Sequence, residues 1–356
     1  MRPRVIDLFS GVGGLSLGFE IAGFDVILAN EYDTSIANSY SKNHPGTGMI
    51  IGDITKLDLK EIFYPYKNKI DVIIGGPPCQ GFSQKGKRKT IYDERNYLFQ
   101  YFVKTVFMVK PRYFLMENVP NLLTAENGFF IQEIEELFLD LGYKIKYKVL
   151  NASDYGVPQN RRRAIIIGKL GSIPPRFPDI IEERVNVWDA ISDLNYLNSG
   201  EGEEVSEYLL EPRSNYQRML RDGSGKLYNH KSTKHSEVVL QRLSLIPSNG
   251  NRDALPKQHL TKSTYSGTWS RMKVNEPSVT ITTRFDTPSS GQFTHPYLNR
   301  AVTVREAARI QSFPDKFIFY GNKSSQMKQV GNAVPPLMAE KIAKAILEDI
   351  KEAKND

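Results

Sequence analysis

The chain contains a single cysteine, Cys79, within the segment "IIGGPPCQGFSQ" at residues 73–84. Pro77 and Pro78 precede it directly and restrict the backbone at that point. A thiol is a useful nucleophile only as its thiolate, which requires an electropositive and partly exposed site. A lone cysteine is more often a small buried hydrophobic residue, so other residues must decide between the two interpretations.

Three polar residues near the ends of other apolar runs favour the nucleophile. Glu117 lies near the end of "YFLMENV", and Arg161 and Arg163 begin "RRRAIIIGK". Taken alone, each has a structural explanation, as a sheet-edge acid or as part of a surface arginine patch. Together with Cys79 they supply a nucleophile, a proton donor and fixed cations, which indicates catalysis in one cleft.

A glycine-rich turn near the N-terminus indicates a second part of the same cleft. In "DLFSGVGG" an apolar run leads into Gly11, Gly13 and Gly14, and Glu31 ends the next apolar run. Asp53 ends the one after that. Glycines that open a helix and acids at neighbouring strand ends are typical of sites for adenosine-containing ligands. The spacing GxGG leaves open whether the ligand is a nicotinamide cofactor or S-adenosylmethionine.

Strand and helix patterns alternate along the first part of the chain and predict the elements that position these residues. Strands are expected at 5–9, 25–32, 48–54, 69–78 and 113–119, followed by a strand pair at 144–152 and 162–169. This alternation predicts an α/β fold with a doubly wound, mostly parallel sheet. Such sheets bind ligands beyond the carboxyl ends of their strands, where all the residues above are expected. A last amphipathic helix after Pro335 and Pro336 is expected to pack back on this domain.

Composition is that of an ordinary globular chain, with 40% hydrophobic and 24% charged residues. No apolar stretch reaches the ~20 residues that a membrane span requires, and the first residues lack a signal-peptide core. One cysteine permits neither an internal disulfide nor a zinc site of several thiolates. A cytosolic enzyme is therefore expected.

The middle of the chain lacks regular alternation and predicts a second, smaller and irregular domain. Residues 179–210 hold nine acids against one arginine, whereas residues 211–276 hold twelve Lys and Arg against five acids. A basic stretch of this kind is either a solvated face or a surface that meets phosphates. We expect a catalytic domain at 1–185 with 325–356, and the small domain at 186–324.

Eight short segments, in this order, resemble those of the DNA (cytosine-5)-methyltransferase family of bacterial, restriction-modification type. They are "DLFSGVGG", "NEYD", "GDI", "GGPPCQGFS", "ENV", "QNRRR", "REAARIQSFPD" and "QVGNAVPP". The resemblance covers nearly the whole chain, and no segment is broken at a key position. It implies a Rossmann-like methyltransferase sheet joined to a small target-recognition domain.

The resemblance implies a mechanism for the polar residues. The Cys79 thiolate attacks C6 of cytosine, which activates C5 to take a methyl group from S-adenosylmethionine, leaving S-adenosylhomocysteine. Glu117 contacts N3 and the amino group, and Arg163, with Arg161 nearby, holds O2. No metal is required. The implied cofactor-binding residues are Phe9, Gly11, Gly13, Gly14, Glu31, Tyr32, Asp53, Ile54, Pro78 and Asn332.

The resemblance also implies that double-stranded DNA is the partner. A carbon inside a duplex is out of reach of a thiol, so the cytosine must be flipped out, and the loop from Ser83 to about Asn96 would close over it, as in the family. The basic stretch would make phosphate and base contacts. The residues expected to bind DNA are Ser83, Lys85, Lys87, Arg88, Arg252, Lys262 and Arg271.

Three alternatives remain at this stage. They are a transfer-RNA cytosine-5-methyltransferase on the same scaffold, a nicotinamide oxidoreductase, and a DNA-binding protein without catalysis. The ~115 residues between the two regular parts, enough for a small domain, favour DNA over transfer RNA, and the intact Cys79, Glu117 and Arg163 favour an enzyme. We expect a cytoplasmic monomer associated with the nucleoid through DNA, with a cognate endonuclease acting separately and no membrane partner.

Overall fold

The computed structural model describes residues 2–78, 97–262 and 266–353 of the chain. They divide into two compact units. Unit 1 comprises Met1–Asn151, Arg162–Ile180 and Pro336–Asp356, and unit 2 comprises Ala152–Arg161 and Ile181–Pro335.

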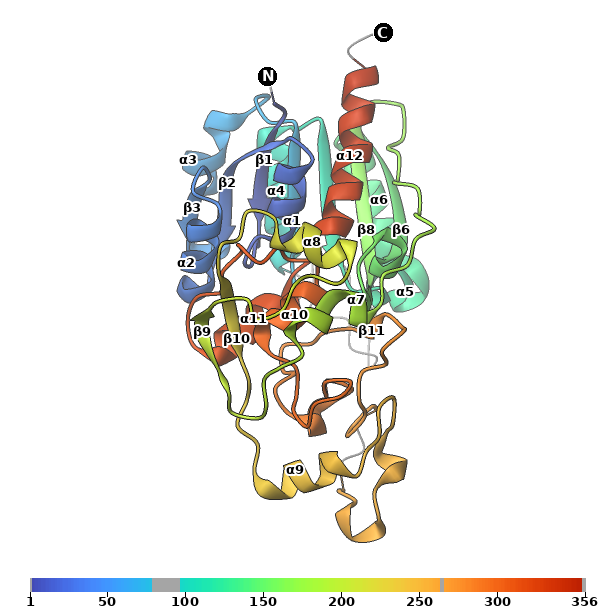
Figure 1. Ribbon diagram of the computed structural model, residues 1–356. Helices are drawn as coiled ribbons and strands as arrows, with labels where there is room; N and C mark the ends of the chain where they lie inside the picture. The colour runs from blue at the N-terminus through green and yellow to red at the C-terminus, as the bar shows by residue number, and fades with distance from the viewer. Residues whose placement is uncertain (1, 79–96, 263–265, 354–356) are drawn as a thin grey trace. The chain divides into compact units, whose positions relative to one another are not determined.

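Unit 1 is built on a seven-stranded sheet in the order β3-β2-β1-β4-β5-β8-β6 (Figure 1). The strands are β1 (Arg4–Leu8), β2 (Asp25–Glu31), β3 (Gly48–Ile51), β4 (Val72–Gly75), β5 (Tyr113–Asn118), β6 (Tyr143–Asn151) and β8 (Arg162–Leu170). β8 runs antiparallel to both of its neighbours, and the other adjacent pairs are parallel. The prediction of a doubly wound, mostly parallel sheet is therefore confirmed.

The strand order reverses between β1 and β4, which lie side by side at the centre of the sheet. The chain moves outward from β1 to β3, crosses back to β4, and then moves outward in the other direction. A crevice opens at such a reversal, beyond the carboxyl ends of the strands. The glycine-rich turn follows β1 and the segment leading to Cys79 follows β4, so the topology brings both to this edge.

Helices cover both faces of the sheet. On one face α3 (Leu59–Phe63), α4 (Tyr97–Val109) and α6 (Phe129–Asp140) share a hydrophobic core with the strands. α1 (Gly14–Ile21) and α12 (Pro336–Glu352) lie on the opposite face (Figure 1). With both faces covered, the central strands read as continuous apolar runs, which is why the sequence predicts them well.

The last helix packs on unit 1, as predicted. Gly18 of α1 allows the close approach, because a β-carbon there would lie 2.4 Å from Ala339 Cβ. Asp349 of α12 accepts hydrogen bonds from Tyr113 Oη at 3.0 Å and from Lys169 Nζ at 2.7 Å. These contacts fix α12 to β5 and β8. Two further helices, α2 (Thr34–Asn43) and α5 (Asn121–Thr124), complete the α-helices of unit 1 in the described residues.

Unit 2 consists of short elements joined by long irregular segments. Its strand pairs are β9 (Gly202–Ser206) with β10 (Leu227–Lys231), antiparallel, and β7 (Gln159–Asn160) with β11 (Ser278–Val279), parallel. Its α-helices in the described residues are α7 (Val187–Ile191), α8 (Asn215–Arg221), α9 (Glu237–Ser244), α10 (Val304–Ile310) and α11 (Lys323–Asn332). Within residues 278–285 only two residues form a strand, β11.

Buried ion pairs lie among the apolar side chains in the core of unit 2. Arg300 makes a bidentate pair with Glu306 at 2.7 and 2.8 Å, and Arg309 makes one with Asp315 at 2.9 and 2.6 Å. All four side chains are fully buried. Burial alone would raise the pKa of Glu306, but the adjacent Arg300 guanidinium brings it below its ordinary value. The segment "REAARIQSFPD" is therefore an internal scaffold of unit 2.

The bounds of the two units differ from those predicted for the domains. The expected boundary at 324/325 falls inside α11, which belongs to unit 2. Residues 152–161 also belong to unit 2, because β7 pairs with β11, 119 positions further along (Gln159 with Ser278). Among the described residues, no helix is long and apolar enough to span a membrane.

Candidate functional site

Glu117 and Arg163 meet at the carboxyl end of β5. Strand β8 pairs antiparallel with β5, with Asn118 opposite Ala164, and this register brings Arg163 beside Glu117. The Arg163 Nε lies 2.7 Å from Glu117 Oε1, and both side chains are largely buried, at 15% and 13% exposure. The structure thus joins the predicted proton donor to one of the two predicted cations.

The segment that leads to Cys79 is anchored to the same strand end. Asn118 Nδ2 donates a hydrogen bond to the Pro77 carbonyl at 2.9 Å. A β-carbon at Gly76 would lie only 3.1 Å from Glu117 Oε2, so the glycine allows close approach to that carboxylate. Pro78 is the last described residue before the gap, and Cys79 lies outside the described residues. Sequence reasoning missed the role of Asn118, although "ENV" contains it.

The glycine-rich turn has an unusual backbone. Phe9, Gly11 and Gly13 adopt left-handed conformations with φ of 56°, 56° and 94°. The Gly11 amide donates to Glu31 Oε2 at 2.9 Å, and the Asp33 amide donates to Glu31 Oε1 at 2.9 Å. Burial raises the pKa of Glu31, and these two hydrogen bonds oppose the rise. Glu31 is therefore tied to the turn, as the prediction of one shared site requires.

The residues around this turn suit an adenosine-containing ligand. Space beside Gly11 is open, since no atom of the described residues lies within 4 Å of where a β-carbon would be. The buried Ser10 hydroxyl has no hydrogen-bond partner among the described residues. The Tyr32 ring is 74% exposed and is available for stacking. Gly14 begins α1 directly after the turn.

Asp53 and Ile54 lie where β3 is followed by a short 3-10 helix, Ile54–Lys56. Asp53 Oδ1 accepts hydrogen bonds from the Thr55 amide at 3.0 Å and the Thr55 hydroxyl at 2.8 Å. These bonds lower the pKa of Asp53. Ile54 is buried at 2% exposure, and its side chain belongs to the hydrophobic core of unit 1.

Arg161 does not accompany Arg163. Arg161 precedes β8 and belongs to unit 2, where its guanidinium, 1% exposed, donates to the carbonyls of Ile281 and Gly331 at 3.1 and 2.8 Å. These bonds hold the segment after β11 to the end of α11. The neighbouring Asn332, a predicted cofactor ligand, is the last residue of α11 and also lies in unit 2. A catalytic role for Arg161 stays a prediction, and its hydrogen bonds give it a structural one.

Arg271 is not available to contact DNA, contrary to the prediction. It is 3% exposed, and each of its five N–H groups has an acceptor inside unit 2. The acceptors are the carbonyls of Leu243, Ile246, His295 and Leu298 and the Asn299 side chain. A strongly basic stretch makes a buried arginine hard to distinguish from a DNA-binding one in the sequence.

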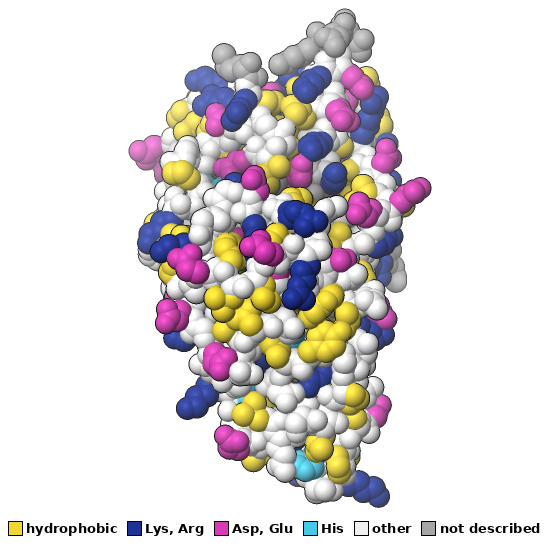
Figure 2. Space-filling model, in the orientation of Figure 1, with side chains coloured by type: hydrophobic (Ala, Val, Ile, Leu, Met, Phe, Trp, Pro, Cys, Tyr) yellow, Lys and Arg dark blue, Asp and Glu magenta, His cyan; other side chains and the backbone are white. Residues whose placement is uncertain are grey.

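Other cations of the basic stretch also have partners within the chain. Arg221 pairs with Asp193, Lys226 with Glu207 and Lys273 with Glu276. On the face drawn in Figure 2, lysines and arginines alternate with acidic side chains. At these three positions, acidic side chains therefore offset the positive charge of the stretch.

Of the remaining residues expected to bind DNA, two are described. Lys262 is exposed, and Arg252 is half-buried with a weak hydrogen bond to the Thr261 carbonyl at 3.4 Å. Thr261, which precedes Lys262, accepts a hydrogen bond from Trp269 Nε1 at 3.0 Å, and Trp269 belongs to a small core with Leu243, Ile246 and Leu255. Ser83, Lys85, Lys87 and Arg88 lie outside the described residues.

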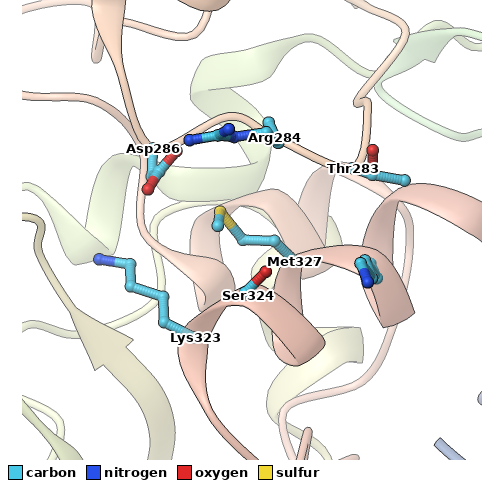
Figure 3. A pocket seen from close by; sticks show the side chains of 7 residues that line it. Thr283, Arg284, Asp286, Lys323, Ser324 and Met327 are labelled. Atoms are coloured by element: carbon cyan, nitrogen blue, oxygen red, sulfur yellow. The ribbon is translucent and has the colours of Figure 1, made fainter.

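A polar cavity of about 440 Å³ opens in unit 2 at the start of α11 (Figure 3). Arg284, Lys323 and Lys328 supply three cations, Asp286 one anion, and Thr283 and Ser324 hydroxyls. Burial lowers the pKa of Lys323, whose Nζ donates to Thr233 Oγ1 at 2.6 Å. The lining therefore has an excess of positive charge. Among the described residues, no cluster of three or more His, Cys, Asp or Glu side chains could hold a metal ion.

The fold and the site together define a class. A doubly wound sheet carries a glycine turn and a strand-end acid at its reversal point, with a carboxylate–arginine pair two strands along. This combination is that of an α/β enzyme with an adenosine-type cofactor.

Comparison with known proteins identifies the family within this class. The profile of the C-5 cytosine-specific DNA methylases matches residues 3–348, and the chain belongs to this family. A Type II methyltransferase, M1.HphI of Haemophilus parahaemolyticus, is 40% identical over 351 residues, 98% of this chain and 87% of that protein. M.DdeI of Desulfomicrobium norvegicum, also a Type II methyltransferase, is 38% identical over 371 residues, covering 96% and 88%.

Solved structures agree on the fold. A prophage-encoded protein of E. coli, described as a candidate DNA modification methyltransferase, has a TM-score of 0.78 at 30% identity, covering 98% of this chain and 99% of that one. The Dnmt2 methyltransferase of S. pombe has a TM-score of 0.60 at 18% identity, covering 98% and 99%, and shows the likeness of fold alone. The prediction of a DNA cytosine-5-methyltransferase is confirmed at the level of the family and its reaction.

Proposed function

We propose that this enzyme methylates C5 of a cytosine flipped out of a specific site in duplex DNA, through a covalent bond between Cys79 and C6. The observation that carries the proposal is the buried Glu117–Arg163 pair beside the anchored Gly76–Pro78 segment. In the sequence Cys79 comes two residues after Pro77, whose carbonyl accepts a hydrogen bond from Asn118, the neighbour of Glu117 at the end of β5. A nucleophile, a carboxyl group and a guanidinium are thereby expected in one place.

Each residue has a role that balances charge. As the Cys79 thiolate adds to C6, electron density moves toward N3 and O2 of the ring. Glu117 contacts N3 and the amino group and supplies the proton that neutralises N3, while Arg163 stabilises the charge on O2. After C5 has taken up the methyl group, its proton passes to water, which restores the C5–C6 double bond and expels the thiolate, and N3 returns its proton to Glu117. Because Arg163 already contacts Glu117, the two side chains are positioned before substrate binds.

The glycine turn is proposed to hold S-adenosylmethionine. This cofactor supplies an electrophilic methyl group on a sulfonium. Phe9 and the turn glycines would surround it, Glu31 would bind the ribose hydroxyls, Tyr32 would stack on the adenine, and Asp53 and Ile54 would meet its edge. Pro78 and Asn332 complete the proposed set. The open space at Gly11, the exposed Tyr32 ring and the unpaired Ser10 hydroxyl support the assignment.

A restriction-modification setting is proposed from the relatives, which are named Type II methyltransferases. The enzyme would then protect host DNA in the bacterial cytoplasm from a separate endonuclease that cuts the same site. It would act as a monomer, because one chain supplies every proposed catalytic residue.

The proposal is tested with methyl-labelled S-adenosylmethionine, mixed-sequence duplex DNA and transfer RNA. We expect label in DNA as 5-methylcytosine at one sequence, and none in transfer RNA. DNA with 5-fluorocytosine at that site should give a covalent adduct on Cys79, because fluorine cannot leave as the C5 proton does. Label in transfer RNA alone would reverse the choice of substrate, and methylation without an adduct would refute the covalent mechanism.

The cavity at the start of α11 is proposed to take a DNA backbone phosphate, because its lining has three cations and two hydroxyls. The variant Arg284→Gln/Lys328→Gln should weaken DNA binding at low salt. It should also reduce the slope of log affinity against log salt concentration by about one for each lost phosphate contact. Titration of labelled duplex at several salt concentrations measures both, with Lys60→Gln, at an exposed lysine of unit 1, as the control. An unchanged slope in the double variant would exclude this cavity as a phosphate site.

A further inference from the structure

Two aromatic rings lie directly beneath the glycine turn of unit 1. Gly13 caps α1 with φ of 94°, and a β-carbon on it would lie 2.3 Å from His44 Nε2 and 2.8 Å from Tyr40 Cε2. The His44 and Tyr40 rings pack against each other, with centroids 4.3 Å apart. Both side chains are fully buried, and the two rings pack against Gly13 and support the turn from the protein interior.

The first ring is held by a contact between His44 and the carboxylate of Glu20. His44 follows the last residue of α2, and its Nδ1 lies 3.0 and 2.9 Å from the two carboxylate oxygens of Glu20 on α1. A carboxylate that contacts one ring nitrogen fixes the orientation of an imidazole, and with it the position of the other nitrogen. The Nε2 edge is thereby held toward Gly13.

The second ring is held by a hydrogen-bond chain on the other side of the turn. The Tyr40 hydroxyl lies 2.8 Å from Ser16 Oγ, and Ser16 donates to Asp7 Oδ2 at 2.6 Å. Asp7 belongs to β1, immediately before the turn, and is fully buried. Burial raises the pKa of Asp7 to about 8, an effect that the Ser16 hydrogen bond partly offsets. Two polar contacts therefore tie α2 to α1 and β1 around Gly13.

We propose that His44 is a positioning residue for S-adenosylmethionine, acting through the glycine turn without touching the cofactor. Its ring fills the space under Gly13 and sets the left-handed turn that also directs the Gly11 amide to Glu31. This inference rests on the proposed function, because it assumes that the turn binds the cofactor. Without the His44 ring, the glycine turn can adopt other conformations. The free energy needed to order the turn when the cofactor binds would then weaken the affinity for the cofactor.

The test measures binding of S-adenosylhomocysteine to the full chain by calorimetry, without DNA. His44→Ala should raise the dissociation constant by about tenfold or more, as is usual for residues that support a binding group from behind. In steady-state assays the KM for S-adenosylmethionine should rise, while kcat at saturating cofactor and the KM for DNA stay near wild type. His44→Gln keeps a polar group near Glu20 but lacks the ring. Its dissociation constant should lie between those of wild type and His44→Ala. If His44→Ala does not fold, His44→Gln replaces it in these measurements.

His230→Ala is the matched control, because His230 is also a fully buried histidine but lies in unit 2. It should lower the denaturation midpoint and leave affinity for S-adenosylhomocysteine unchanged. The inference is overturned if His44→Ala and His44→Gln bind like wild type, or if both histidine sites lose affinity equally. If wild type itself does not bind S-adenosylhomocysteine, the proposed cofactor fails, which is a distinguishable result.

Discussion

Replacing Glu117 with glutamine should lower the rate of methyl transfer by about 10²–10⁴-fold at saturating DNA and cofactor. Glutamine keeps the size of the side chain and an oxygen that can accept from Arg163, whose Nε lies 2.7 Å from the native carboxylate. It has no acidic proton to give to N3 when sulfur adds to C6. Single-turnover assays with labelled cofactor measure this step apart from product release.

Two neighbouring arginines provide a second test variant and its matched control. Arg163→Lys removes the planar guanidinium that contacts Glu117 and should also slow the chemical step strongly. Arg162→Lys, at an exposed position one residue away, should keep nearly the full rate. A Glu117→Gln enzyme within threefold of wild type would contradict the role of this carboxyl group, provided that the folded fractions are equal.

Much of the fold of unit 1 could be predicted because its signals are local. The apolar runs ending at Leu8, Glu31 and Gly75 become parallel strands buried on both faces. The residues after such runs gather at one edge whatever the details of packing. This is why the glycine turn, Glu31 and Glu117 could be assigned to one edge of the sheet from the sequence alone.

The predictions that differ from the structure concern residues whose partners lie far away in the sequence. Arg161 and Arg163 are two positions apart, and strand alternation would direct them to one face. β8 begins only at Arg162, however, and Arg161 instead bonds to Ile281 and Gly331, 120 and 170 positions away. Local periodicity carries no information about such partners.

The charged residues of unit 2 also have partners that the sequence does not reveal. Its core contains charged side chains in which each guanidinium meets a carboxylate or a set of carbonyls, as for Arg300, Arg309 and Arg271. A buried charge requires this pairing, but a sequence shows only that arginines and acids are present. Composition therefore left open a solvated face and a phosphate-binding surface, whereas the structure has several internal ion pairs.

Unit 2 should lose stability steeply as the pH falls from about 6.5 toward 3. His230 and His295 are fully buried, and burial lowers the pKa of each from 6.5 to about 3, against the opposing effect of Glu306. Below pH 6.5 the unfolded chain takes up protons that the folded chain excludes, so unfolding becomes more favourable as acid is added. Each histidine adds up to about 1.4 kcal/mol per pH unit to the slope, and the two together up to about 2.8.

The two tryptophans of the chain make this measurable for unit 2 alone. Trp188 and Trp269 both belong to unit 2, and the Trp188 ring lies 6.3 Å from that of His295. Urea denaturation followed by tryptophan fluorescence at pH 8, 6 and 4.5 gives the free energy of unfolding at each pH. His295→Gln should lower stability at pH 8 through lost packing, yet flatten the fall between pH 6 and 4.5 by up to about 1.4 kcal/mol per unit. A variant profile parallel to that of wild type would mean that His295 takes up its proton in the folded protein as readily as in the unfolded chain.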